Sequence, residues 1–197
     1  MTILNLLGAA LTGYLLGSIP TGVLISRLFG WPDPRTHGSG HTGATNVSRA
    51  AGLPALLLVM TLDLLKGAGA VLLAAAVFKE PWAVPLAGIA AAAGHNWPVW
   101  TSFRGGMGLA VSAGAVLTQM PLAVVITGAA WLLLRPLIRH SPRTTIAACV
   151  TVPLTLALLR AAPPIFALGT GAAAVIALRT LRDWNRVYEK KQPEGAT

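Results

Sequence analysis

Long uncharged stretches separated by short charged loops make up most of this chain. Five stretches contain no Asp, Glu, Lys or Arg, namely Met1–Ser26, Pro81–Phe103, Gly105–Leu134, Thr144–Leu159 and Ala161–Leu178. A sixth stretch, Ala50–Phe78, is apolar except for Asp63 and Lys66. Because a helix needs about 20 apolar residues to cross a bilayer, the pattern predicts an all-α, polytopic membrane protein.

The positions of Lys and Arg raise the predicted number of helices from six to seven. Gly105–Leu134 is long for one span, and Thr118–Pro121 within it has the composition of a turn. With a break there, twelve of the 15 Lys and Arg lie in loops on one side, two (Lys79 and Arg160) lie on the other, and Lys66 lies inside a span. The positive-inside rule then places the amino terminus outside and the carboxyl terminus in the cytoplasm. The fourth helix is expected to be short, roughly 10–13 residues, and to begin in a partly buried glycine loop.

Composition supports the membrane assignment and excludes several other classes. The 197 residues are 54% hydrophobic and 11% charged, whereas soluble domains carry about 25% charged residues. Cys149 is the single cysteine, which excludes a disulfide scaffold and a Cys-based zinc cluster. The net charge of +9 alone would suggest nucleic acid, but the predicted cytoplasmic loops account for it, so no nucleic-acid partner is expected. We expect one integral-membrane domain over residues 1–197.

A glycine-rich segment on the cytoplasmic side, residues 38–49, is the first candidate site. Gly38, Gly40 and Gly43 have the spacing G-x-G-x-x-G, but a nucleotide-binding fold would require a preceding strand rather than membrane helices. Such glycines can instead turn backbone N–H groups towards an anion, and the helix that follows presents its amino end. Hydroxyl donors and a cation are added by Ser39, Thr42, Thr45 and Arg49. The segment therefore predicts a phosphate cradle, with a flexible loop containing turn glycines as the alternative.

A second glycine turn, with a histidine and an arginine, is predicted on the same side. It comprises Gly94–Pro98 and Phe103–Gly108. His95 is a candidate acid, base or phosphate donor, with a hydrogen-bonded packing role as the alternative. Trp97 and Trp100 are typical of interface anchors.

Asp63 and Lys66 are the two charges within a predicted span. Their i,i+3 spacing places them on one face of a helix. Charges inside a membrane are costly and indicate function by default. The alternative is a mutually satisfied pair that fixes helix packing.

Several enzyme classes lack their characteristic residues. The sequence contains neither H-x-x-x-x-D, the motif of soluble-type glycerolipid acyltransferases, nor the G-x-S-x-G nucleophile elbow. Asp33 is the single carboxylate in the predicted cytoplasmic loops before the tail. A metal-assisted phosphatase or CDP-alcohol transferase would need several, so no metal or other cofactor is expected.

Five segments together resemble the bacterial acyl-phosphate-dependent glycerol-3-phosphate acyltransferases (the PlsY family). In chain order they are Gly17–Gly22, Gly38–Arg49, Asp63–Gly67, Gly94–Pro98 and Phe103–Gly108. The resemblance implies seven helices in the bacterial inner membrane and an active site on the cytoplasmic face. It implies acyl transfer from acyl phosphate to the 1-hydroxyl of glycerol 3-phosphate, giving lysophosphatidic acid without acyl-CoA, acyl carrier protein or metal. An enzyme that produces acyl phosphate is the implied partner.

The resemblance also implies roles for individual residues. One phosphate would be held by Gly38, Ser39, Gly40, Thr45, Asn46 and Arg49. The second or departing phosphate would be held by Arg104, Gly105, Gly106 and Gly108. His95 and Asn96 would orient a substrate, with Arg104 as the third catalytic residue, while Asp63 and Lys66 would support the site. A substrate phosphate is expected to accept the proton of the attacking hydroxyl.

Some positions differ from the family's usual pattern. His41 replaces an Asn, Met107 replaces the Lys of Gly-Gly-Lys-Gly, and Val111 replaces a Thr. Pro142 replaces a Ser, and Thr180–Asp183 replaces His-Arg-x-Asn. Loss of the Lys removes a cation expected on a substrate phosphate. A second interpretation is therefore a catalytically weak or inactive paralogue that acts as a membrane partner or lipid-phosphate binding protein.

Overall fold

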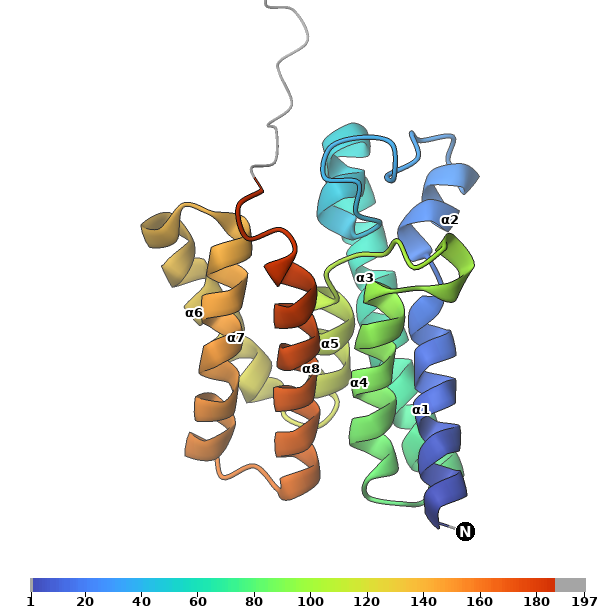
Figure 1. Ribbon diagram of the computed structural model, residues 1–197, viewed down its shortest axis with the longest axis vertical. Helices are drawn as coiled ribbons and strands as arrows, with labels where there is room; N and C mark the ends of the chain where they lie inside the picture. Colours follow the sequence, from blue (N-terminus) through green and yellow to red (C-terminus); the bar gives the residue numbers. More distant parts are fainter. Residues whose placement is uncertain (1, 187–197) are drawn as a thin grey trace, which may run out of the picture.

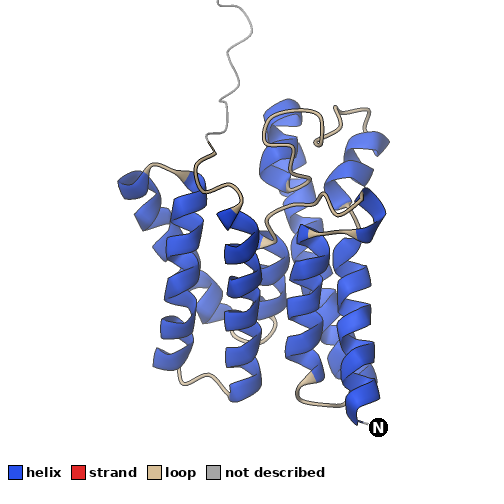
Figure 2. Cartoon of the chain, viewed as in Figure 1, coloured by secondary structure: helices blue, strands red, loops and turns tan. Residues whose placement is uncertain are grey.

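The computed structural model describes residues 2–186, and these form a helical bundle without β-strands (Figures 1 and 2). The α-helices in chain order are α1 (Thr2–Ser18), α2 (Thr21–Leu28), α3 (Ala44–Phe78), α4 (Ala83–Asn96), α5 (Leu109–Leu117), α6 (Pro121–Ile138), α7 (Ser141–Leu158) and α8 (Pro163–Leu181). One turn of 3-10 helix, Val99–Thr101, follows α4. The all-helical prediction is confirmed for the described residues.

The predicted break in the longest uncharged stretch is confirmed. Helix α5 ends at Leu117 and α6 begins at Pro121, where a proline costs no hydrogen bond because the first N–H groups of a helix have no partner within it. Helix α5 follows the loop Gly105–Gly108, as predicted, and its nine residues make it slightly shorter than expected.

Two helix boundaries differ from the prediction. The first uncharged stretch is divided into α1 and α2 at Ile19–Pro20, because Pro20 cannot continue the hydrogen-bonding pattern of α1. Helix α3 begins at Ala44, earlier than the apolar run, and is kinked at Gly52, whose φ of 76° lies in the left-handed region. The described residues therefore contain eight α-helices rather than seven.

Four helical segments are long and apolar enough to cross a membrane. They are Thr2–Leu28, Ala44–Phe78, Pro121–Ile138 and Pro163–Leu181. Large apolar side chains stay exposed on the outside of the bundle, including Leu4, Leu7 and Leu11 on α1. Such a surface is stable against the hydrocarbon of a bilayer, whereas its exposure to water would be unfavourable.

Glycines bring α1 and α4 into close contact. A Cβ atom on Gly13 or Gly17 would collide with the backbone of Ala87 or Ala91 in α4. Small residues at such a crossing let two membrane helices approach closely. The contact fixes α4, which carries His95 and Asn96 at its carboxyl end. Figure 1 shows α1–α4 on one side, α6–α8 on the other and α5 between them.

Candidate functional site

A cavity of about 1130 Å³ lies between the two sides of the bundle, lined by parts of α3, α5, α6, α7 and α8. One end, here called the polar mouth, is formed by the amino ends of α3 and α7 and the carboxyl ends of α6 and α8. These helix ends lie together at the upper end of Figure 1. Its lining includes Ser39, Thr45, Arg49, Arg135, Arg139, Ser141 and Arg186. The rest of the lining is mostly apolar, so the cavity joins a cationic opening to a hydrophobic interior.

The side chain of Asn46 organises the glycine-rich loop beside this mouth. Its amide nitrogen donates to the carbonyl oxygens of Pro34 (2.7 Å), His41 (2.9 Å) and His37 (3.2 Å). Its oxygen accepts from the backbone N–H of Ser39 at 2.8 Å. Asn46 therefore shapes the loop through nearly all of its hydrogen-bonding capacity.

Only some residues of the predicted phosphate cradle line the cavity. Ser39, Thr45, Asn46 and Arg49 line it, whereas Gly38 and Gly40 are outside its lining. Gly38 has a φ of +56°, and a Cβ there would overlap the oxygen of Asn46, so this glycine is needed for the loop to close. Arg49 donates to the same oxygen at 3.0 Å, which places the guanidinium at the amino end of α3.

A buried ionic network supports His95. The Lys66 ammonium lies 2.9 Å from the carbonyl oxygen of Ile19, 3.0 Å from Oδ1 of Asp63 and 3.1 Å from Nδ1 of His95. The Thr21 hydroxyl donates to the same Asp63 oxygen at 2.5 Å. An ammonium has three N–H donors and no acceptor, so these contacts use all of them. Nδ1 of His95 also lies 3.5 Å from the same Asp63 oxygen, so the three side chains contact one another.

The loop Gly105–Gly108 packs directly on His95 and Asn96. The Gly106 N–H donates to the His95 carbonyl oxygen at 3.0 Å, and a Cβ on Gly106 would overlap Nε2 of His95. Gly108 has a φ of +79°, and a Cβ there would lie 2.6 Å from Oδ1 of Asn96. These glycines therefore fit the loop to the end of α4. Of the residues named in this paragraph, His95 and Gly108 line the cavity.

Most of the cations at the cavity are not the ones expected from the sequence motifs. Arg104 is exposed and does not line the cavity. Arg49 does line it, together with Arg135 of α6, Arg139 directly after α6, and Arg186 beyond α8. Three of these four arginines were not among the predicted site residues. The sequence indicated only that these three arginines lie in loops on the predicted cytoplasmic side.

Residues that depart from the family's pattern contact one another at the polar mouth. Nε2 of His41 lies 2.9 Å from Oδ2 of Asp183 and 3.3 Å from Arg179. The Thr180 hydroxyl lies 3.6 Å from the sulfur of Met107. The carboxyl end of α8 is thus joined to both loops that the sequence identified as candidate sites.

Burial lowers the pKa of His41 to about 4, and the positive charges of Arg179, Arg186 and Arg49 act in the same direction. The carboxylate of Asp183 opposes this shift. His41 is therefore neutral at physiological pH, even though it contacts a carboxylate.

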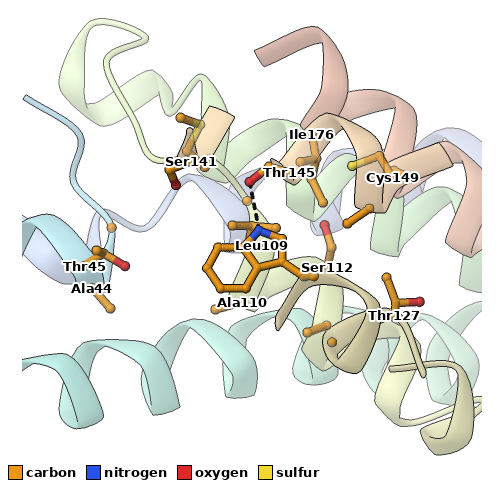
Figure 3. A pocket seen from close by; sticks show the side chains of 18 of the residues that line it. Ala44, Thr45, Leu109, Ala110, Ser112, Thr127, Ser141, Thr145, Cys149 and Ile176 are labelled. Atoms are coloured by element: carbon orange, nitrogen blue, oxygen red, sulfur yellow. Dashed lines mark hydrogen bonds between the residues drawn. The ribbon is translucent and has the colours of Figure 1, made fainter. Parts of the chain in front are cut away.

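The hydrophobic interior is crossed near its opening by a side-chain hydrogen bond. The indole N–H of Trp131 in α6 donates to the Thr145 hydroxyl of α7 at 3.2 Å. Figure 3 shows this bond as a dashed line at Thr145, with Ser141, Ser112 and Cys149 around the same cavity. Farther from the mouth, the lining is mostly small and branched apolar residues, including Val116, Ala123, Leu156 and Ala172.

Comparisons with known proteins agree with one another. The family model described as glycerol-3-phosphate acyltransferase matches residues 7–190. A curated glycerol-3-phosphate acyltransferase of Legionella pneumophila (strain Corby) is 38% identical over 189 residues, which cover 93% of this chain and 66% of that protein. One of Pseudomonas aeruginosa (strain LESB58) is 46% identical over 154 residues, covering 76% of this chain and 78% of that protein. The chain thus spans just under two thirds of the length of the Legionella relative.

Solved structures give the same result. The crystal structure of PlsY (YgiH), an integral membrane glycerol 3-phosphate acyltransferase, in its glycerol 3-phosphate form has a TM-score of 0.81 and 33% identity. Its lysophosphatidic acid form has a TM-score of 0.79 and 31% identity. Each comparison covers 92% of this chain and 90% of the other.

Proposed function

The chain belongs to the glycerol-3-phosphate acyltransferase family, and on this premise we propose that it transfers an acyl chain to glycerol 3-phosphate, giving lysophosphatidic acid. The proposed donor is acyl phosphate. The observation that carries the proposal is the joined cavity: an arginine-lined mouth suits phosphate, and a hydrophobic interior suits an acyl chain. The related structures bear the names of glycerol 3-phosphate and lysophosphatidic acid forms, which supports the acceptor and the product.

The proposed reaction is one acyl transfer between two phosphate-bearing substrates. The hydroxyl oxygen of glycerol 3-phosphate forms an ester bond with the acyl carbon, and the bond from that carbon to the phosphate oxygen breaks. The departing phosphate keeps the electron pair of that bond, and a substrate phosphate accepts the hydroxyl proton. The described residues at the cavity offer one carboxylate, Asp63, which is already engaged by Thr21 and Lys66.

Residue roles in this proposal follow the observed geometry. Arg49, with Ser39 and Thr45 beside it, binds one phosphate at the amino end of α3, where the helix dipole also favours an anion. Arg135 and Arg139, at the carboxyl end of α6 and directly after it, bind the other phosphate. His95, held by Lys66 and lining the cavity, orients a substrate. A further set of residues maintains these positions: Gly38, Gly40, Asn46, Asp63, Asn96, Gly105, Gly106 and Gly108.

Acyl transfer by the purified protein tests the proposal. The expected result is lysophosphatidic acid from palmitoyl phosphate and labelled glycerol 3-phosphate, with no product when palmitoyl-CoA is the donor. Product from the CoA ester alone would overturn the proposed donor, and no product from either would overturn the proposed activity. The alternative of a non-catalytic membrane partner gains no support from relatives that are named as enzymes.

We also propose seven spans in a bacterial inner membrane, with the polar mouth facing the cytoplasm and an acyl-phosphate-producing enzyme supplying the donor there. The clustering of arginines at one end of the bundle supports this orientation. In a Cys149→Ala background, Arg139→Cys should react with a membrane-impermeant thiol reagent only after the cells are opened. Lys79→Cys should react in intact spheroplasts. The reverse pattern would overturn the proposed orientation.

A further inference from the structure

We propose that the buried end of the cavity, where Leu156 of α7 packs over Gly169 of α8, sets the longest acyl chain that this protein accepts. The inference rests on the proposed function, and it adds a chain-length limit that the activity alone does not require. Both residues line the cavity, and Leu156 is completely buried. A Cβ atom on Gly169 would lie 2.5 Å from the Cδ1 atom of Leu156, so the leucine side chain closes the space directly against the backbone of α8.

The depth of the cavity can be estimated along α7. Ser141 begins this helix at the polar mouth, and Leu156 lies fifteen residues farther along it. At about 1.5 Å per residue, the separation along the helix axis is about 22 Å. An extended chain of C–C bonds of about 1.5 Å at near-tetrahedral angles advances about 1.25 Å per carbon. The cavity therefore accommodates about 18 carbons between the mouth and Leu156.

Intermediate positions on the same wall should give proportionally shorter limits. Ala148 is 5% exposed and lines the cavity seven residues from Ser141. A bulky side chain there would block the cavity about 10 Å from the mouth, which corresponds to about eight carbons. The Trp131–Thr145 hydrogen bond lies nearer the mouth and holds the α6 wall against α7, so the chain must pass it in either case.

The main physical alternative is that the tail of the acyl chain leaves the cavity sideways into the lipid. Helix α6 is the wall where such an exit would occur, because Ala123 is its single buried residue and the rest of the helix is at least partly exposed. If the tail passed between α6 and its neighbours, the far end of the cavity would place no limit on chain length. Substitutions in α7 distinguish the two arrangements. A change at the far end of the cavity should alter the chain-length limit only if the tail reaches that end, and changes on the outer face of α7 serve as controls.

The test compares two cavity variants with two matched variants on the outer face of α7. The cavity variants are Leu156→Ala and Ala148→Phe. The controls are Leu154→Ala and Val150→Phe, at positions that are 62% and 70% exposed. Binding of alkyl phosphates of 8 to 22 carbons, a series chosen to bracket the estimate of about 18, is measured as a thermal shift. Product lengths are then measured from an equimolar mixture of acyl phosphates.

The expected binding limit of the unaltered protein is about 18 carbons. Leu156→Ala should raise it by about three carbons, the number of side-chain carbons removed. Ala148→Phe should lower it to about eight to ten carbons, and neither control should move it. An unchanged limit in Leu156→Ala would overturn the inference, whatever the result for Ala148→Phe. Because the alkyl phosphates do not react, a shifted binding limit without acyl transfer would instead refute the proposed activity and leave the chain-length limit standing.

Discussion

Replacing Asp63 with Asn should destabilise the protein strongly, because it leaves the Lys66 ammonium buried without a counter-ion. The two side chains are only 2% and 5% exposed, and their charged atoms are 3.0 Å apart. Asn has nearly the same shape as Asp, so packing is retained while the charge is lost. Removing one partner of a buried ion pair costs about 3–5 kcal/mol. For a protein of this size, that cost lowers the midpoint of thermal unfolding by about 6–20 °C.

The measurement uses Cys149, the single cysteine, whose reaction with a fluorogenic thiol reagent reports unfolding in detergent. Asp33→Asn provides the matched control. Asp33 and Arg35 are also paired, at 2.5 Å, but their side chains are 27% and 32% exposed. The hydrogen bond from Arg35 lowers the pKa of Asp33 to about 2, yet exposed pairs contribute only about 0–1 kcal/mol. The control should therefore shift the midpoint by about 4 °C at most.

A compensating variant separates charge from packing. Asp63→Asn combined with Lys66→Met removes both charges and should recover part of the lost stability, because no uncompensated charge then stays buried. Equal midpoints for Asp63→Asn and the unaltered protein would refute this explanation. So would a double variant less stable than Asp63→Asn alone.

Three further predictions concern the polar mouth. Arg49→Ala should raise the KM for glycerol 3-phosphate about 10- to 100-fold, which corresponds to the loss of one charge-assisted hydrogen bond. Ser39→Ala should raise the KM less. An unchanged KM in both variants would show that the loop is only structural. The unaltered protein should lose up to about 3 kcal/mol of stability as the pH falls from 6.5 to 4, because the pKa of His41 is lowered to about 4 in the folded protein and the unfolded chain binds the proton more readily. His41→Gln should flatten unfolding midpoints measured across that range, and an equally steep profile would contradict the assignment. Met107→Lys should increase acyl transfer about tenfold or more by adding a cation to the cavity lining; a folded but slower variant would show that Met107 belongs to a differently built site.

Hydropathy and charge predicted the helices well because the bilayer leaves the backbone few alternatives. The turn at Thr118–Pro121 was identified on this basis. The break at Ile19–Pro20 was not, because it lies within an uncharged stretch that is short enough for a single span, and the charges gave no reason to divide it. The early start of α3 at Ala44 was also missed, since polar residues occupy its first two turns.

The candidate site was harder to predict than the fold. Local motifs identified the two loops but not what their side chains contact, and Asn46 is engaged in shaping its own loop. Arg104 belongs to the recognised motif but does not line the cavity. Arg135, Arg139 and Arg186 belong to no motif and do line it. Their arrangement depends on how α6, α7 and α8 pack, which no local pattern in the sequence describes.

The break between α1 and α2 also has a consequence for how the sequence can change over evolution. In a continuous helix the Ile19 carbonyl would accept from the N–H of Val23, but here Val23 donates to Pro20 instead. The Ile19 carbonyl also accepts from the Thr21 N–H, and its second lone pair is thereby available to the Lys66 ammonium. A mutation that repaired the helix at Pro20 would deprive a distant lysine of a ligand. Pro20, Asp63 and Lys66 should therefore be inherited as a unit, retained together or exchanged together among homologues.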